Sequence, residues 1–197
     1  MTHGTFTLFA WLAMSSAFAA IPMTYLAYRL ESRVDPLGML MQGGLQLVAT
    51  LLFVAITLML KRFLNRVFAF HDTDKSIDVL VMANVVAGVL LIAGSCYPEI
   101  RETVGPAALV LMVFAGGVQI QFGYKLTKLQ NNLGGLRAPF CYLNMATGVC
   151  IASIVLMLAG VVLSAISDLM LATIFFTIAK ELKEAERSRS ETKGGES

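Results

Sequence analysis

The chain has 197 residues, of which 57% are hydrophobic and only 14% are charged, with a formal net charge of +2. Soluble domains carry about 25% charged residues, so this composition excludes an ordinary soluble globular protein. The small net charge also argues against nucleic acid as a partner. We expect an all-α integral membrane protein with several passes through a cell membrane, most simply a bacterial inner membrane.

The apolar segments predict a transmembrane bundle of six helices arranged as three hairpins. A span of about 20 apolar residues matches a hydrocarbon layer about 30 Å thick. Pro22 should kink the first span or end its regular part. Pro106 lies just inside the expected start of the fourth, where proline is tolerated. The first four spans are predicted at residues 6–28, 38–60, 77–97 and 104–124.

The last apolar stretch, residues 140–179, has two interpretations. A single long helix would give five spans, whereas a hairpin would give six. We predict the hairpin, with its turn between Gly160 and Asp168 and with Ser167 or Asp168 capping the final helix. The sixth span is then short, at residues 169–179, unless it begins as early as Val161.

The positions of the basic residues predict the orientation. Twelve of the fifteen Lys and Arg residues fall in the gaps after the second, fourth and sixth spans, and only Arg29, Arg33 and Arg101 fall elsewhere. Basic loops stay on the cytoplasmic side, so both termini are expected inside. A single long last helix would abolish this asymmetry. Residues 17–19 also fit a signal-peptidase site, and cleavage there would leave the orientation of the other spans unchanged.

Two parts of the chain are expected to differ in order. Residues 1–187 should form the transmembrane bundle, with no second domain. Residues 188–197 are rich in Ser, Gly and charge, which predicts a disordered cytoplasmic tail.

A layer of polar side chains is predicted in the cytoplasmic third of the third, fourth and fifth spans. Carboxamides inside hydrocarbon need partners, and pairing across helices is worth about 0.6 to 2 kcal/mol each. The layer either holds the bundle together or lines a hydrated vestibule that binds a small polar solute. Its members are Asn84, Gln119, Gln121, Asn144 and Thr147.

Asp168 is the one carboxylate that the prediction brings near the membrane interior. An intramembrane acid is a candidate proton or cation site. Asp168 has no evident basic partner, however, and it follows a serine at the expected start of a helix. We therefore predict a helix cap at the outer surface, and an acid inside the membrane if the last helix begins near Val161.

The loop after the second span has two further patterns. Residues 71–74 (His-Asp-Thr-Asp) resemble a metal-ligand set in residue type, but one short loop with one imidazole is better explained by helix capping. Basic residues alternate with aromatic residues along 61–70, as in segments that lie at a membrane interface. Contact with anionic lipid headgroups is predicted for Lys61, Arg62, Arg66, Lys125 and Lys128.

No catalytic motif is recognisable, and we expect neither enzyme activity nor a cofactor or metal. The two histidines, His3 and His71, lie outside the spans, which excludes a bis-histidine haem within the membrane. Small residues four apart, such as Gly148 and Ala152, favour close helix packing, within a homo-oligomer or against another membrane protein. The predicted function is a non-catalytic accessory, assembly or scaffold subunit. The alternative is a small carrier or channel for a small, largely uncharged solute.

Overall fold

The computed structural model describes residues 2–31 and 36–194, and every regular element in this part of the chain is helical. Arg33 and the last three residues of the expected tail lie outside the described residues. The elements are α1 (His3–Glu31), α2 (Pro36–Phe68), α3 (Asp74–Cys96), α4 (Pro98–Leu126), the short 3₁₀ helix η1 (Leu133–Gly135), α5 (Arg137–Ala152) and α6 (Met157–Gly194).

Five of the six α-helices are long and apolar enough to cross a membrane: α1, α2, α3, α4 and α6. The helix α5 has 16 residues, which at 1.5 Å per residue gives about 24 Å, less than a full hydrocarbon layer. The fold is therefore that of a helical membrane bundle with five long apolar helices and one shorter helix.

The last apolar stretch is a hairpin, as predicted, but the predicted position of its turn is wrong. The turn lies between α5 and α6, at residues 153–156. The Ser153 hydroxyl donates to the Cys150 carbonyl at 2.9 Å and accepts the Leu156 N–H at 3.3 Å, and Ile154 adopts a left-handed φ of 56°. Hydroxyl bonding of this kind offers the backbone an alternative to the helix even in an apolar segment.

Gly160, which we expected at the turn, lies inside α6. A Cβ added there would meet Ile151 Cγ1 at 3.1 Å, so this glycine permits close packing of α5 against α6. The interpretation of residues 140–179 as one unbroken helix is also wrong.

The prolines occupy different helix positions from those predicted. The helix α1 continues through Pro22 to Glu31, so Pro22 does not end it. The helix α4 begins at Pro98, earlier than expected, which places Pro98 in the first turn and Pro106 inside the helix. Pro98 has the fixed φ and the missing N–H that suit a helix start.

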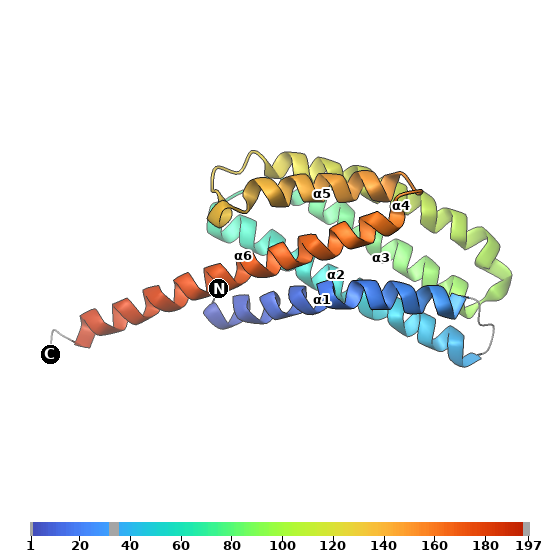
Figure 1. Cartoon of the computed structure of the whole chain (residues 1–197), viewed down its shortest axis with the longest axis horizontal. Coiled ribbons are helices and arrows are strands. Elements are labelled where there is room, and N and C mark those ends of the chain that lie inside the picture. The colour runs from blue at the N-terminus through green and yellow to red at the C-terminus, as the bar shows by residue number, and fades with distance from the viewer. Residues whose placement is uncertain (1, 32–35, 195–197) are drawn as a thin grey trace.

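The six helices form a closed ring. Each packs against its neighbours in the sequence, and α6 closes the ring by packing along α1; in the described chain, helices on opposite sides of the ring have no Cα atoms within 8 Å of each other. Both chain ends lie at the same end of the molecule, where α6 extends beyond the other helices (Figure 1). We call this the terminal end and the other the distal end.

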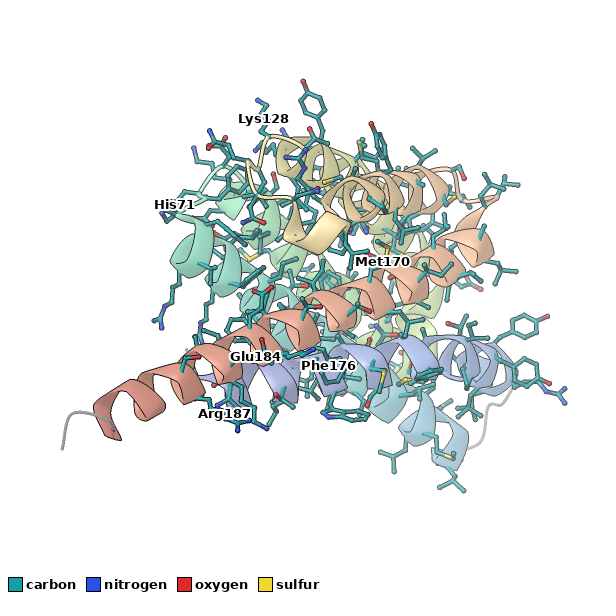
Figure 2. All side chains as sticks on the ribbon, turned by 60° about the vertical axis from the view of Figure 1, so that its left-hand side comes forward. His71, Lys128, Met170, Phe176, Glu184 and Arg187 are labelled. Atoms are coloured by element: carbon teal, nitrogen blue, oxygen red, sulfur yellow. The ribbon has the colours of Figure 1, made fainter. Side chains whose placement is uncertain are left out.

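Apolar side chains cover the outside of the ring. Phe18 is 69% exposed, Leu40 is 74% exposed and Leu158 is 75% exposed. Apolar surface of this extent does not face water in a monomeric soluble protein. Four polar or charged residues labelled in Figure 2 (His71, Lys128, Glu184 and Arg187) lie towards the terminal end. The surface therefore matches a lipid-facing belt with a charged end.

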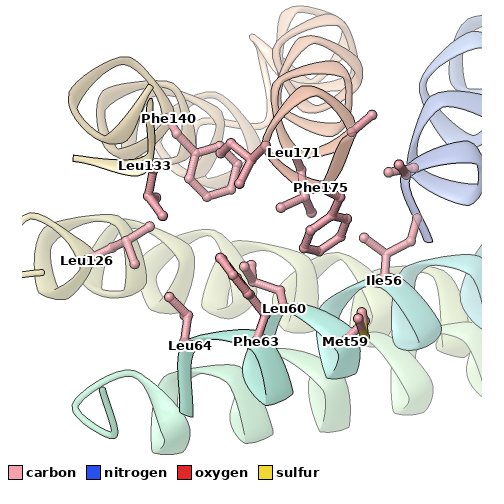
Figure 3. Packing of buried hydrophobic residues seen from close by; sticks show 14 of the residues in the cluster. Ile56, Met59, Leu60, Phe63, Leu64, Leu126, Leu133, Phe140, Leu171 and Phe175 are labelled. Atoms are coloured by element: carbon pink, nitrogen blue, oxygen red, sulfur yellow. The ribbon is translucent and has the colours of Figure 1, made fainter. Parts of the chain in front are cut away.

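An aromatic plug, formed by Phe6, Phe63, Phe68 and Phe175, fills the ring near its terminal end. Phe63 is fully buried, and its ring centroid lies 5.8 Å from those of Phe6 and Phe175 and 5.1 Å from that of Phe68. Edge-to-face pairs at these distances are the favoured aromatic geometry. Figure 3 shows leucines and Phe140 continuing this packing from α2, α4, α5 and α6. The plug joins α1, α2 and α6, which are remote from one another in the sequence or separated by a loop.

Glycines set the close contact between α4 and α5. A Cβ on Gly116 would lie 2.7 Å from the Gly148 carbonyl oxygen, and one on Gly148 would lie 2.6 Å from the Gly116 carbonyl oxygen. About two turns further along α4, Gly123 faces Cys141 in the same way, because a Cβ on Gly123 would lie 2.9 Å from the Cys141 carbonyl oxygen. Backbones approach this closely only where both helices carry small residues.

Candidate functional site

A cavity of about 370 Å³ lies within the ring and receives side chains from all six α-helices. The volume falls within the range of small-molecule sites. Its polar lining consists of hydroxyl, carboxamide and carboxyl side chains: Ser16, Thr24, Gln46, Thr50, Thr57, Asn84, Gln119, Asn144, Ser164, Ser167 and Asp168.

The cavity is at the depth of the middle of the bundle. Ser16, Thr50 and Asn84 lie near the midpoints of α1, α2 and α3. Asp168 is about 16 Å along α6 from Met157, at 1.5 Å per residue. Polar groups buried at this position pair with one another, with water or with a ligand.

Asn144 connects Gln119, another residue of the predicted polar layer, to Ser167 on α6. Its amide nitrogen donates to Ser167 Oγ at 3.0 Å and to the Phe140 carbonyl at 2.9 Å, and its oxygen accepts from Gln119 Nε2 at 3.4 Å. Both nitrogen and oxygen therefore have partners, and the side chain is buried. This part of the cavity wall connects α4, α5 and α6.

Two polar oxygens at the cavity have no partner in the described structure. Asn84 Oδ1 and Thr50 Oγ1 are buried and make no hydrogen bond. Thr50 lies directly against α3, because a Cβ on Gly88 would be 2.6 Å from its hydroxyl oxygen. A buried acceptor without a partner loses about 1 to 3 kcal/mol relative to a satisfied one. A water molecule or a ligand within the cavity would supply the missing partners.

Asp168 is inside α6 and not at its start, so the prediction of a helix cap is wrong. The carboxylate accepts a hydrogen bond from Ser16 Oγ at 2.9 Å, which joins the middle of α6 to the middle of α1. Ser167, the other expected cap, is buried and accepts from Asn144. The cause is the earlier turn at residues 153–156, which moves both residues into the helix.

Gln121 and Thr147 do not line the cavity. Gln121 accepts from Ser76 Oγ at 3.4 Å, and Lys125 Nζ donates to the same hydroxyl at 3.1 Å, on the contact between α3 and α4. The Thr147 hydroxyl donates to the Leu143 carbonyl of its own helix at 2.8 Å. The structure thus brings together three of the five residues of the predicted layer: Asn84, Gln119 and Asn144.

The prediction missed the polar residues that α1 and α2 contribute and, on α6, Ser164; Asp168 was expected inside the membrane only if the last helix began near Val161, and α6 begins at Met157. Single Ser and Thr residues in apolar helices commonly bond to their own backbone, so each alone carries little signal. Their spacing carries more: Ser16, Ala20 and Thr24, and likewise Gln46 and Thr50, lie four apart on one helix face. Ser164 and Asp168 repeat the pattern on α6. Three helices with such polar faces, α1, α2 and α6, would have indicated that these faces line a common cavity.

The predicted headgroup residues have mixed surroundings at the terminal end. Arg62 and Arg66 are exposed. Lys61 pairs with Asp78 at 2.6 Å, and the Lys128 ammonium lies 5.7 Å from the centre of the Tyr124 ring. Contact of these residues with lipid stays a prediction.

The loop before α3 forms a local hydrogen-bonded cluster. Asp74 accepts from Asn65 Nδ2 at 2.9 Å and lies 3.2 Å from His71 Nδ1. Thr73 occupies the N-cap position of α3, but its hydroxyl makes no capping bond. Thr73 therefore stands at the expected cap position, but its side chain does not form the capping hydrogen bond.

No family model, curated protein or solved structure matches this chain. The cavity and the ring of helices are therefore the features that bear on function.

Proposed function

We propose that the protein is a multi-pass membrane carrier that binds a small polar solute in the cavity. The observation that carries this proposal is the pair of unpartnered buried oxygens, Asn84 Oδ1 and Thr50 Oγ1, beside a polar cavity at mid-bundle. Hydrogen bonding across helices would explain a dry layer of mutually paired amides. It does not explain acceptors left without donors next to empty space.

The plug favours a carrier over an open channel. Phe6, Phe63 and Phe175 fill the ring between the cavity and the terminal end, so a solute cannot pass straight through. Transport would then need a rearrangement of the ring, in which the plug separates as the opposite side closes. Small rigid-body movements of helices are the usual basis of such alternating access.

The topology of the proposal follows from charge. The basic segments after α2, after α4 and along the end of α6 belong to the terminal end, which the positive-inside rule assigns to the cytoplasm. The protein then crosses the membrane six times, with α5 as a short pass and both termini inside. We place it in a bacterial inner membrane, with its basic residues against anionic headgroups.

Substitution of the amides tests the proposal. Purified protein is screened for thermal stabilisation by a panel of small polar solutes, since a ligand that binds the folded state raises the melting temperature, by an amount that grows with the logarithm of its concentration relative to its Kd. Solutes that bind are then used for flux into proteoliposomes. The double variant Asn84→Leu with Gln119→Leu should fold and lose both binding and flux.

Gln121→Leu is the matched control, because Gln121 lies two residues from Gln119 but outside the cavity. It should keep binding and flux. Unchanged flux in the double variant, or no stabilisation of the wild type by any solute, would contradict the carrier proposal.

A second candidate is the accessory or scaffold role, which one observation favours. The end of α6 extends past the bundle with exposed charged residues (Figure 1), as a docking segment for another subunit would. This role needs no catalysis. Mass analysis of the complex purified in mild detergent tests it, and a single species of one chain would contradict it.

A further inference from the structure

The cavity holds an acidic side chain with no basic partner in the described part of the chain. Asp168 is the one ionisable side chain among its described lining residues, which include no Lys, Arg or His. In the part of the chain that the structure describes, the carboxylate has no ion pair, and Ser16 is its hydrogen-bond partner. Carboxylates inside a membrane pair with a cation or mark an ion or substrate pathway.

The hydrogen-bonding capacity of the cavity points the same way. Asn84 Oδ1 is an acceptor without a donor, Thr50 Oγ1 is unpaired, and one Asp168 oxygen is free of the bond from Ser16. A protonated amine supplies donors only and accepts nothing. It therefore complements this set of oxygens better than a sugar or an alcohol, which would bring further acceptors.

The rest of the wall is apolar and partly aromatic. Phe53, Ile56, Phe122, Phe140 and Leu171 line the cavity. A bare Mg²⁺ or Ca²⁺ ion would need six or more oxygen ligands and would gain nothing from these side chains. An organic cation can contact both the polar and the apolar side chains of the cavity. Its apolar part packs against the aliphatic and aromatic groups, and aromatic faces also attract cations.

From this juxtaposition we infer that the ligand of the cavity is a small organic ammonium ion, a primary amine with a short apolar group. The ammonium group binds Asp168 and the unpaired oxygens of Asn84 and Thr50. The apolar group lies towards Phe122 and Phe140. The inference rests on the proposed carrier function and replaces the expected uncharged solute with a cationic one.

Binding to the purified full-length protein in detergent tests the inference, using three amines with matched alcohols. The probes are phenethylamine, cyclohexylamine and butylamine, each as its hydrochloride, with 2-phenylethanol, cyclohexanol and butanol as neutral partners. At least one amine should raise the melting temperature and bind at least tenfold more tightly than its alcohol. Sodium chloride at equal ionic strength controls for salt.

Two variants test whether amine binding depends on the Asp168 carboxyl group. Asp168→Asn keeps the size of the side chain and should weaken amine binding at least tenfold, while binding of the alcohol stays the same. Asp78→Asn removes an acid outside the cavity, paired with Lys61, and should leave amine binding unchanged. Equal binding of amine and alcohol by the wild type, or equal amine binding by Asp168→Asn, overturns the inference.

The two proposals fail differently. If a neutral solute binds, the Asn84→Leu and Gln119→Leu double variant loses that binding, and no amine binds more tightly than its alcohol, the carrier stands and the ammonium ligand is overturned. If neither amines nor neutral solutes bind, both fall. Because the comparison of amine with alcohol uses the wild type alone, the result does not depend on a variant that folds.

Discussion

Asn144 shows how much a single residue can organise in this bundle. It bonds to Ser167 on α6 and to Gln119 on α4, and it also bonds the Phe140 carbonyl of its own helix. Its type and place in the chain were enough to predict a polar contact between helices. Its partner on α6 was not predictable, because that depends on a turn four residues long at 153–156.

The bond between Asn144 and Ser167 should be measurable as a coupling energy. The double-mutant cycle of Asn144→Ala and Ser167→Ala should give about 0.6 to 2 kcal/mol, the range for hydrogen bonds between membrane helices. The measurement is reversible unfolding in SDS. The pair Asn144 and Thr173, which share no hydrogen bond, is the control and should show additive effects. Additivity for Ser167 as well would contradict the assigned bond.

Phe63 should be among the most sensitive apolar positions. It is fully buried among three aromatic rings, so Phe63→Ala leaves a cavity in the plug and should lower the free energy of unfolding by about 3 kcal/mol. Unfolding of purified protein by SDS measures this. Phe114 is exposed, and Phe114→Ala should change the free energy by less than about 0.5 kcal/mol. Similar losses in both variants would contradict the plug.

Helix pairs in this protein are held by contacts that differ in kind. The contact between α4 and α5 depends on glycine. The contact between α1 and α6 includes the Ser16–Asp168 hydrogen bond and the Trp11–Phe176 ring pair. The helices α5 and α6 are joined by a tight turn. Of these, the small-residue contact was partly visible in the sequence, through Gly148 and Ala152. The others join residues more than 150 positions apart or depend on local turn geometry.

Adjacent glycines in α4 give a direct test of the helix contact. Gly116→Ala should be destabilising by about 1 to 3 kcal/mol, because its Cβ would lie 2.7 Å from the Gly148 carbonyl and 2.9 Å from the Ala152 nitrogen. Gly117→Ala meets nothing within 4 Å and should stabilise the helix slightly through alanine's higher propensity. Thermal unfolding in detergent measures both. Equal melting temperatures would contradict the packing.

At the scale of the whole molecule, the ring exposes apolar side chains on its outer surface and also has a mainly apolar core. Within that core, polar side chains from all six α-helices line one cavity, and aromatic rings pack near one end. This arrangement explains why an unremarkable set of Ser, Thr, Asn and Gln residues forms one site. Each polar face is short, but six helices in a ring direct several of them to the same axis.

The proposed topology predicts which cysteine reacts from outside the cell. Cys96 is exposed at the end of α3, on the distal side, whereas Cys141 is buried. A membrane-impermeant maleimide should therefore label Cys96 in intact cells and leave Cys141 unlabelled. A cysteine placed at Arg62 should react only in inverted vesicles.

A reporter fused after Ser197 should be cytoplasmic, and export of that reporter would overturn the even number of crossings.

Hydropathy and the order of the charged segments were sufficient to predict an all-helical membrane bundle whose last apolar stretch folds back, because both are properties of local sequence. Residue type likewise indicated Asn84, Gln119 and Asn144. The ring, the plug and the inward place of Asp168 required the folded chain. A polar residue on an apolar helix faces lipid, a neighbouring helix or a cavity according to how that helix packs, and packing joins segments that the sequence keeps far apart.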